Sequence, residues 1–497
     1  MEIENMAPNM DLPEQKWPSA SSRIVLDGPS TIPDSPHDEE APLSAFSIVE
    51  PPADLTIITT TASTAANPHL HPNPGDTFPD GGTRSWLVIF GSFCLLMASY
   101  GLMNSVGVLQ NYFASHQLSA YSASAVGWIP GLFTFFGLGL GVQVGPMFDR
   151  YGPTGILIAG TTCYVAGLML LAECRLYWHF VLTLGILSGT GAALLSTAAM
   201  ATVPQWFERR VGLAMGVAMA GSGLGGVTFP LVLRAAIARV GYRWAIRLLA
   251  LLVLVMCALG IALVKSRLPR GRSKSAINLR YFQDSRFTWL TLGIFSLELE
   301  VFAGLGLYPT YVVMQGFSTS TSVILLSILN VASTLGRLIA GAVGDRYGRI
   351  NTQTGLIALG AVAIFTIWLP FGNTLPGLYA FSVLFGLASG SFLSLAPACI
   401  GQISKASEAG GRFGICYSTV SLAYVLFSPL VSSSDVQVAN ISDRTLICVP
   451  IGGEMLEKVG KRAMVAYLGS VLILALGMFV MARWACLSYR WRWQAKV

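Results

Sequence analysis

Charged residues are scarce in this chain. Asp, Glu, Lys and Arg make up 11% of its 497 residues, whereas hydrophobic residues make up 53%. A water-soluble domain carries roughly 25% charged residues. A chain of this length with so few charges has too little polar surface to cover a soluble globule, so we expect most of it to contact lipid. The 52 glycines agree with this, because glycine is more frequent in membrane helices than in soluble ones.

Motifs for catalysis and for cofactors are also missing. The eight cysteines include no C-x-x-C pair and no metal-ligand spacing, so we interpret them as small hydrophobic residues. No G-x-x-x-x-G-K-[ST] segment for ATP is present, and no nucleophile, base or metal cluster stands out. The sequence therefore predicts no enzyme activity, no cofactor and no metal site.

The first 84 residues differ in composition from the rest. They hold thirteen acidic and three basic residues, so this segment carries a formal charge of −10 and the remainder carries +16. Its stretch 27–42 is acidic and rich in Pro and Ser, and such a segment cannot bury enough apolar surface to offset chain entropy. We expect 1–84 to be a disordered cytoplasmic tail, either regulatory or simply solvated. No signal peptide precedes the first long apolar run, which begins at Trp86.

Apolar runs of about twenty residues recur from Trp86 onward, and this length crosses ~30 Å of hydrocarbon. They predict an all-α polytopic membrane fold with twelve transmembrane helices. We expect an N-terminal six-helix bundle at 85–265, a cytoplasmic linker at 266–287, a C-terminal six-helix bundle at 288–485 and a short basic tail at 486–497. The predicted spans are 86–109, 124–146, 154–173, 178–201, 210–233, 244–264, 289–313, 321–343, 353–371, 376–400, 412–431 and 463–484.

Lys and Arg concentrate in alternate loops. With the N-terminus inside, the inner loops and the linker hold most of them, and the loops near 112–122, 314–320 and 372–375 hold none. The exceptions on the outer side are Arg175, Arg234, Arg239, Arg243 and the basic residues before the last span. This positive-inside bias places both termini in the cytoplasm. We expect a multi-pass protein of the plasma membrane by default, with the vacuolar or another internal membrane as the alternative. Its expected partners are the lipid bilayer and a small-molecule substrate, not nucleic acid; the oligomeric state stays open, with a monomer as one option.

The pattern G-x-x-x-D-R-x-G follows the second predicted span and, 196 residues later, the eighth. Its first Gly lets a neighbouring helix approach closely, and its last Gly permits a tight turn. Its Asp lies at the membrane edge, where it can face the positive N-terminus of another helix. We predict a latch that holds one conformation and releases it in another. The two copies consist of Gly145, Asp149, Arg150 and Gly152, and of Gly341, Asp345, Arg346 and Gly348.

Two matched copies in a twelve-span chain resemble the major facilitator superfamily, which implies two pseudo-symmetric bundles around a central cavity. Further segments resemble its fungal monocarboxylate-transporter-like (monocarboxylate porter) branch. They are Asp80-Gly81-Gly82 before the first span, 104–110 within it, 207–223 leading into the fifth span, and 325–337 in the eighth.

This resemblance implies that Arg337 binds a substrate carboxylate and couples it to a proton. A guanidinium can hold a carboxylate through two parallel hydrogen bonds; the alternative is that Arg337 snorkels toward the cytoplasm. The better-known animal members have a Lys where this chain has Asn104 and an Asp where it has Ser333. If those residues carry proton-coupled lactate transport, a larger or neutral substrate becomes the alternative here.

Ionisable residues inside spans are costly and are therefore functional candidates. Glu298 and Glu300 share the seventh span and point about 200° apart at 100° per residue, so only one is expected to face a cavity. Glu300 is favoured, because Gly304 lies one turn later on the same face. We expect one of them to pair with Arg337 and to carry a proton; the alternative is a partly hydrated acid with a structural role.

Other residues are candidates with two open interpretations each. Polar side chains in the spans either line a substrate site or only join helices by hydrogen bonds; they are Asn104, Gln110, Asn330 and Tyr311. Small residues at three- and four-residue spacing form either a gating surface or static packing; they include Gly216, Gly221 and Gly225.

A polar stretch at 431–449 interrupts the eleventh predicted span. Three interpretations are open: an outer loop, an altered span, or an intron translated in error. It holds Asn440 in the only glycosylation sequon of the chain, and this sequon falls on the predicted outer side, so we predict glycosylation there.

Three functions remain open. Arg337 favours a proton-linked carrier of small monocarboxylates, and this is our working hypothesis within secondary active transport of a small organic acid or metabolite. The absence of the Lys and the Asp favours an efflux pump for a fungal secondary metabolite. The third is a sensor that binds a nutrient without moving it, against which the short tail after residue 485 argues.

Overall fold

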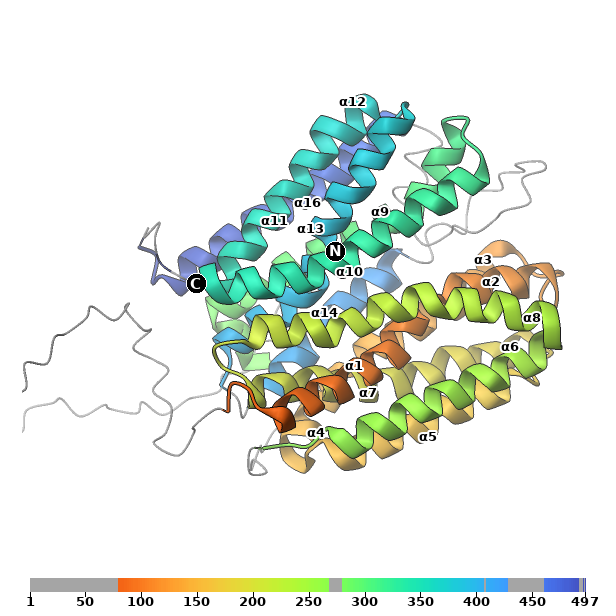
Figure 1. Ribbon diagram of the computed structural model, residues 1–497, viewed down its shortest axis with the longest axis horizontal. Helices are drawn as coiled ribbons and strands as arrows, with labels where there is room; N and C mark the ends of the chain where they lie inside the picture. The colour runs from red at the N-terminus through yellow and green to blue at the C-terminus, as the bar shows by residue number, and fades with distance from the viewer. Residues whose placement is uncertain (1–78, 268–278, 406–407, 428–459, 491–494, 496) are drawn as a thin grey trace, which may run out of the picture. The chain divides into compact units, whose positions relative to one another are not determined.

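The computed structural model describes residues 79–267, 279–405, 408–427, 460–490, 495 and 497. All of them belong to the second of two units into which the chain divides, 1–67 and 68–497. The predicted acidic tail thus lies almost wholly outside the described residues, and so do the stretch 431–449 and Asn440. The described part is helical and contains no strand (Figure 1), as the sequence predicted.

The N-terminal half runs from α1 to α8 (Figure 1). Its elements are α1 (Thr83–Met103), α2 (Val106–Ser115), α3 (Ala123–Gly139), α4 (Gly141–Tyr151), α5 (Pro153–Leu171), α6 (Tyr177–Phe180), the π-helix η1 (Val181–Ser188), α7 (Gly189–Trp206) and α8 (Val211–Leu263).

The C-terminal half begins with a short 3-10 helix. Its elements are η2 (Leu279–Gln283), α9 (Ser285–Met314), α10 (Thr319–Tyr347), α11 (Arg349–Ala363), the π-helix η3 (Ile364–Trp368), α12 (Leu369–Phe371), α13 (Leu375–Ile403), α14 (Ala409–Phe427) and α16 (Lys461–Cys486).

Local chemistry sets where several helices begin. The side-chain oxygens of Ser122, Ser318, Thr374 and Asp284 accept hydrogen bonds from backbone N–H groups in the first turns of α3, α10, α13 and α9. Such caps satisfy donors that have no partner inside the helix. Unpaired donors are most costly near hydrocarbon, so polar residues at these loop ends define the entry points of the spans.

Ten helices in the described residues are long and apolar enough to cross a membrane. One of them, α8, has 53 residues and bends at Gly241, whose φ is +77°. The sequence predicted two spans here with a loop at 234–243. The structure instead has helix on both sides of one glycine, because a positive φ redirects the chain at a single residue. α14 occupies the place of the eleventh predicted span, and the total of twelve stays a prediction.

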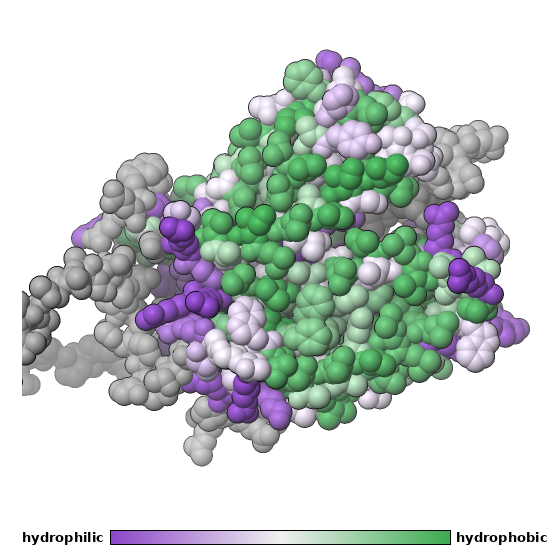
Figure 2. Space-filling model, viewed as in Figure 1, coloured by the Kyte–Doolittle hydropathy of each residue, from purple (hydrophilic) through white to green (hydrophobic). Residues whose placement is uncertain are grey.

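The outer surface carries the apolar side chains expected of a membrane protein. Large hydrophobic residues such as Leu231, Val255 and Val323 are more than half exposed. In Figure 2 the hydrophobic residues form a broad central band, and the hydrophilic residues gather at its two ends. A soluble monomer rarely exposes so large an apolar surface, so this band is the face that lipid covers.

The two halves pack against each other through two equivalent helix pairs. α8 of the N-terminal half lies against α10, and α4 lies against α14. Within each half, α1 packs on α8 and α10 packs on α13. This exchange of equivalent contacts brings the two sequence repeats to the interface between the halves.

Candidate functional site

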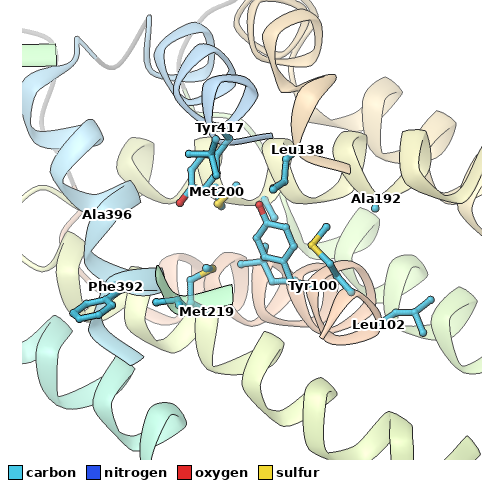
Figure 3. Packing of buried hydrophobic residues seen from close by; sticks show 14 of the residues in the cluster. Tyr100, Leu102, Leu138, Ala192, Met200, Met219, Phe392, Ala396 and Tyr417 are labelled. Atoms are coloured by element: carbon cyan, nitrogen blue, oxygen red, sulfur yellow. The ribbon is translucent and has the colours of Figure 1, made fainter. Parts of the chain in front are cut away.

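A small cavity of about 20 Å³ lies between the two halves. Its wall comes from α1, α3 and α8 on one side and from α9, α13 and α14 on the other. Figure 3 shows Tyr100, Leu138 and Tyr417, from three of these helices, gathered in one region of the interior. The lining residues are Tyr100, Met103, Asn104, Leu138, Met219, Ser222, Glu298, Phe302, Leu393 and Tyr417.

Two buried polar groups in this wall have unused hydrogen-bonding capacity. Glu298 is 3% exposed and Tyr417 is 6% exposed. Within the described part of the chain, Oε1 of Glu298 and the hydroxyl of Tyr417 have no hydrogen-bond partner. Buried polar atoms in folded proteins are nearly always paired, so the wall is chemically incomplete without a ligand or a water molecule.

Arg337 lies behind the wall and does not line it. Its Nη1 donates to the backbone oxygen of Met219 at 3.0 Å and to Oγ of Ser222 at 2.9 Å. Asn104, at the end of α1, donates from Nδ2 to the backbone oxygen of Ser222 at 3.4 Å. Ser222 therefore separates the guanidinium from the cavity. Arg337 is 4% exposed, which excludes the alternative of a side chain that reaches out to the cytoplasm in this conformation.

Glu298 is the acid that lines this cavity. The sequence favoured Glu300 instead, which is not among the lining residues. The two side chains leave α9 in nearly opposite directions, and Glu300 fills the space left by the missing side chain of Gly304, where an added Cβ would lie 3.2 Å from its Oε1. Both oxygens of Glu300 lack partners among the described residues. Neither acid forms an ion pair with Arg337 among the described residues.

The remaining polar candidates lie away from this cavity. Asn330 of α10 is half-buried, and its backbone oxygen accepts from Thr334 at 2.9 Å. Tyr311 accepts a hydrogen bond from Gln315 at 2.8 Å and packs against Trp368. Of the four polar side chains considered from the sequence, the structure places Asn104 alone in the wall.

The repeated aspartates bind helix N-termini of the opposite half. Oδ1 and Oδ2 of Asp345 accept from the N–H groups of Gly212 and Leu213, both at 2.8 Å. Asp149 accepts from the corresponding residues of α14, Gly410 at 3.1 Å and Gly411 at 2.9 Å. In each case the two donors are the second and third residues of a helix, where the positive end of the helix dipole favours a carboxylate. Two equivalent contacts thus join the halves at the ends of α4 and α10.

Glycines of the repeats allow these close contacts because they have no side chain. A Cβ on Gly145 would collide with the carbonyl oxygen of Gly410, and a Cβ on Gly341 would collide with that of Gly212. Gly216 continues the second contact, because its Cβ would meet the carbonyl oxygen of Arg337. Close backbone approach of this kind is what small residues provide in membrane helices.

Gly221 and Gly225 serve a different surface. A Cβ on Gly221 would meet the backbone of Phe93, and one on Gly225 would meet that of Gly101. Both contacts lie between α8 and α1, inside the N-terminal half. The three glycines considered together from the sequence therefore divide into one at the interface between halves and two within a half.

The other motif residues form turns and cover them. Gly152 and Gly348 have φ values of +78° and +99°, the left-handed region that favours glycine. The guanidinium groups of Arg150 and Arg346 lie over the rings of the adjacent Tyr151 and Tyr347, at 5.1 Å and 5.6 Å from the ring centroids.

The hydrogen bonds of two basic residues near these contacts were not predicted from the sequence. Arg349 donates to Asp345 at 3.1 Å and to the backbone oxygen of Glu208 at 2.6 Å. On the other contact, Arg412 of α14 donates to Asp284 at 3.3 Å. The signal available for Arg349 was its position directly after the second motif; nothing in the sequence indicated that Asp284 and Arg412 meet.

Asp284 lies before α9, outside the spans. Burial alone would raise the pKa of its carboxyl. The hydrogen bonds and charge of Arg286, together with the charge of Arg412, have the larger effect, so the pKa lies below its usual range. Asp284 is therefore ionised at neutral pH and holds the first turn of α14.

Comparisons with known proteins agree with this geometry. The family model of the Major Facilitator Superfamily matches residues 88–370 and 331–434. The chain is 35% identical over 418 residues to the fujikurins efflux protein of Gibberella fujikuroi, with 80% of this chain and 87% of that protein covered. It is 32% identical over 443 residues to the riboflavin transporter of Saccharomyces cerevisiae, with 84% and 81% covered.

Among solved structures, the human organic anion transporter MFSD10 matches with a TM-score of 0.61 at 15% identity, with 80% of this chain and all of that chain covered. At this identity the likeness shows the fold alone. Because the family model covers more than half of its length and relatives above 30% identity cover four fifths of it, the chain belongs to the major facilitator superfamily of multi-pass membrane transporters.

Proposed function

We propose that the protein is a secondary active transporter that exports a small, largely apolar organic molecule by alternating access. The observation that carries this proposal is the cavity between the halves, whose wall is drawn from helices of both. The reciprocal contacts of Asp149 and Asp345 with the opposite half support it. A site between two bundles that separate on one side at a time is the arrangement that alternating access requires.

The chemistry of the cavity favours efflux of a metabolite over transport of a small monocarboxylate. The wall is lined mostly by aromatic and apolar side chains with few polar groups, which is typical of sites that hold small organic molecules. Arg337, the expected carboxylate ligand, has its Nη1 hydrogen-bonded to Met219 and Ser222 and lies outside the wall. The names of the two relatives, a fujikurins efflux protein and a riboflavin transporter, fit larger cargo.

The proposed cycle uses the two aspartate contacts as the latch of one state. With both contacts formed, the predicted cytoplasmic ends of α4 and α10 are held against the opposite half, and the cavity exchanges ligand with the other side. Their release lets the halves separate at the cytoplasmic end. The proposed energy source is an ion or substrate gradient, most simply of protons, and Glu298 is the cavity residue available to carry a proton.

Proteoliposomes with an imposed pH gradient test this function. We expect gradient-dependent flux of riboflavin or rhodamine 123, little flux of labelled lactate, and loss of flux in an Asp149→Asn, Asp345→Asn double variant that still folds. Lactate flux above that of both larger probes would instead support the monocarboxylate hypothesis. Tight binding without flux of any probe would support the sensor.

A further inference from the structure

The charge exposed to the cavity has the sign opposite to the one expected from the sequence. Glu298 is the charged side chain among the lining residues. The neighbouring positive charge, Arg337, is turned toward Met219 and Ser222 of α8 and separated from the cavity by Ser222. A bound molecule therefore meets a carboxyl group directly and a guanidinium only through an intervening side chain.

This arrangement sets what the polar end of a ligand must offer. In its ionised state, the carboxylate of Glu298 accepts hydrogen bonds and cannot donate them, and its Oε1 has no partner within the described residues. A ligand N–H or O–H would supply the missing partner. A ligand carboxylate at the same place would bring two acceptors and two like charges together in a site shielded from water, which is strongly unfavourable.

The rest of the wall sets the body of the ligand. Aromatic rings come from Tyr100, Phe302 and Tyr417, and flexible apolar side chains come from Met103 and Met219. Aromatic rings stack on flat apolar molecules and attract cations over their faces. Methionine adapts to irregular shapes, so this wall suits a flat, apolar ring system better than a compact polar solute.

We infer that, in the state of the cycle in which Glu298 is ionised, the cavity selects flat, largely apolar molecules that carry an N–H or O–H donor or a positive charge, and that Glu298 then rejects anionic ligands. This inference rests on the proposed transport function, because it names the cargo of the same cavity. Tyr417, whose hydroxyl also lacks a partner among the described residues, lies in the same wall and is assigned a second hydrogen bond to the ligand.

Two dyes with the same ring skeleton provide the test. Rhodamine 123 is a cation with two amino groups, and fluorescein is an anion at neutral pH. Binding of each to the purified full-length protein in nanodiscs is measured by fluorescence anisotropy. We expect rhodamine 123 to bind at least about tenfold more tightly than fluorescein, the difference that one charge-assisted hydrogen bond supplies.

Matched variants connect this preference to one residue. Glu298→Gln is expected to weaken rhodamine 123 binding about tenfold and to reduce the preference over fluorescein, and Glu298→Asp to keep the preference. Glu300→Gln is the control, because it changes an equally buried carboxyl group on the same helix that does not line the cavity. If Glu298→Gln fails to fold, Tyr417→Phe and the dye preference of the wild type still carry the test.

Each outcome separates this inference from the proposed function. Equal or tighter binding of fluorescein, or an equal effect of Glu300→Gln, would overturn the inference. The expected preference without flux in proteoliposomes would support the ligand class and overturn the transport function. Flux of anions alone would leave the transport function standing and overturn the ligand class.

Discussion

Replacing Asp345 by Asn is expected to open the contact between the two halves. Asp345 is 11% exposed and accepts from Gly212 N and Leu213 N at 2.8 Å and from Arg349 Nε at 3.1 Å. An asparagine has nearly the same shape, but it lacks the charge and keeps only one acceptor oxygen. A charged partner at a helix N-terminus contributes about 1–2 kcal/mol in partly buried geometry, which corresponds to a population shift of roughly 5- to 30-fold.

Distances between spin labels measure this shift directly. Tyr151 at the end of α4 and Tyr347 at the end of α10 are both more than half exposed and belong to opposite halves. Cysteine labels at these two positions, with the accessible native cysteines replaced, report the separation of the halves by double electron–electron resonance. We expect the long-distance population to grow in Asp345→Asn and further in the Asp149→Asn, Asp345→Asn double variant.

Asp80→Asn is the matched control. Oδ1 of Asp80 accepts from Glu208 N at 2.7 Å and Arg209 N at 2.8 Å, so it holds the segment before α8, as Asp345 holds its first turn. Asp80 precedes α1 and therefore holds this segment from within the N-terminal half. Its loss should lower stability without separating the labels. Unchanged distances in the double variant, or equal opening in Asp80→Asn, would refute the latch.

Three further predictions concern single residues. Gly341→Ala should disrupt the contact with α8 and increase labelling of cysteines at the predicted cytoplasmic end, whereas Gly355→Ala, where a Cβ meets open space, should not. Asp284→Asn should lower the Tm at neutral pH; because the folded pKa of Asp284 is depressed, its stabilisation is present above about pH 4 and is lost as the pH falls through the folded value, so the Tm difference from wild type should vanish in acid. Gly241→Ala should cost about 1–3 kcal/mol, because the site has room for a Cβ but its φ of +77° and ψ of +165° lie in a region that essentially only glycine adopts, and thermal unfolding in detergent measures this.

Much of the fold follows from local chemistry that a sequence displays. Apolar runs of membrane length, caps such as Ser318, and glycines at turns such as Gly348 predict where helices begin and end. The motif also predicted a carboxylate at a helix N-terminus, since Asp149 and Asp345 recur at equivalent places in the two repeats. The helix partner of each aspartate was beyond prediction, because it lies 132 or more residues away in the chain and is brought there only by packing.

The site divides in the same way. That ionisable residues in the spans mark a functional region could be predicted, because burying a charge in hydrocarbon is costly without a purpose. Which acid faces the cavity could not, since helical geometry separates Glu298 from Glu300 by direction but does not say which direction is inward. The prediction that Gly304 marks the side of Glu300 that faces the cavity was wrong, because the missing side chain of Gly304 makes room for Glu300 and not for a ligand.

The sequence by itself determined the class of this protein: composition requires lipid contact, run length requires helices, and the repeated motif requires two related halves. Only the tertiary structure decided that the cavity wall exposes Glu298 and that Ser222 separates Arg337 from it. The physical reason is that periodicity and composition act along one chain, whereas the sign of charge in a cavity depends on side chains from six helices of both halves.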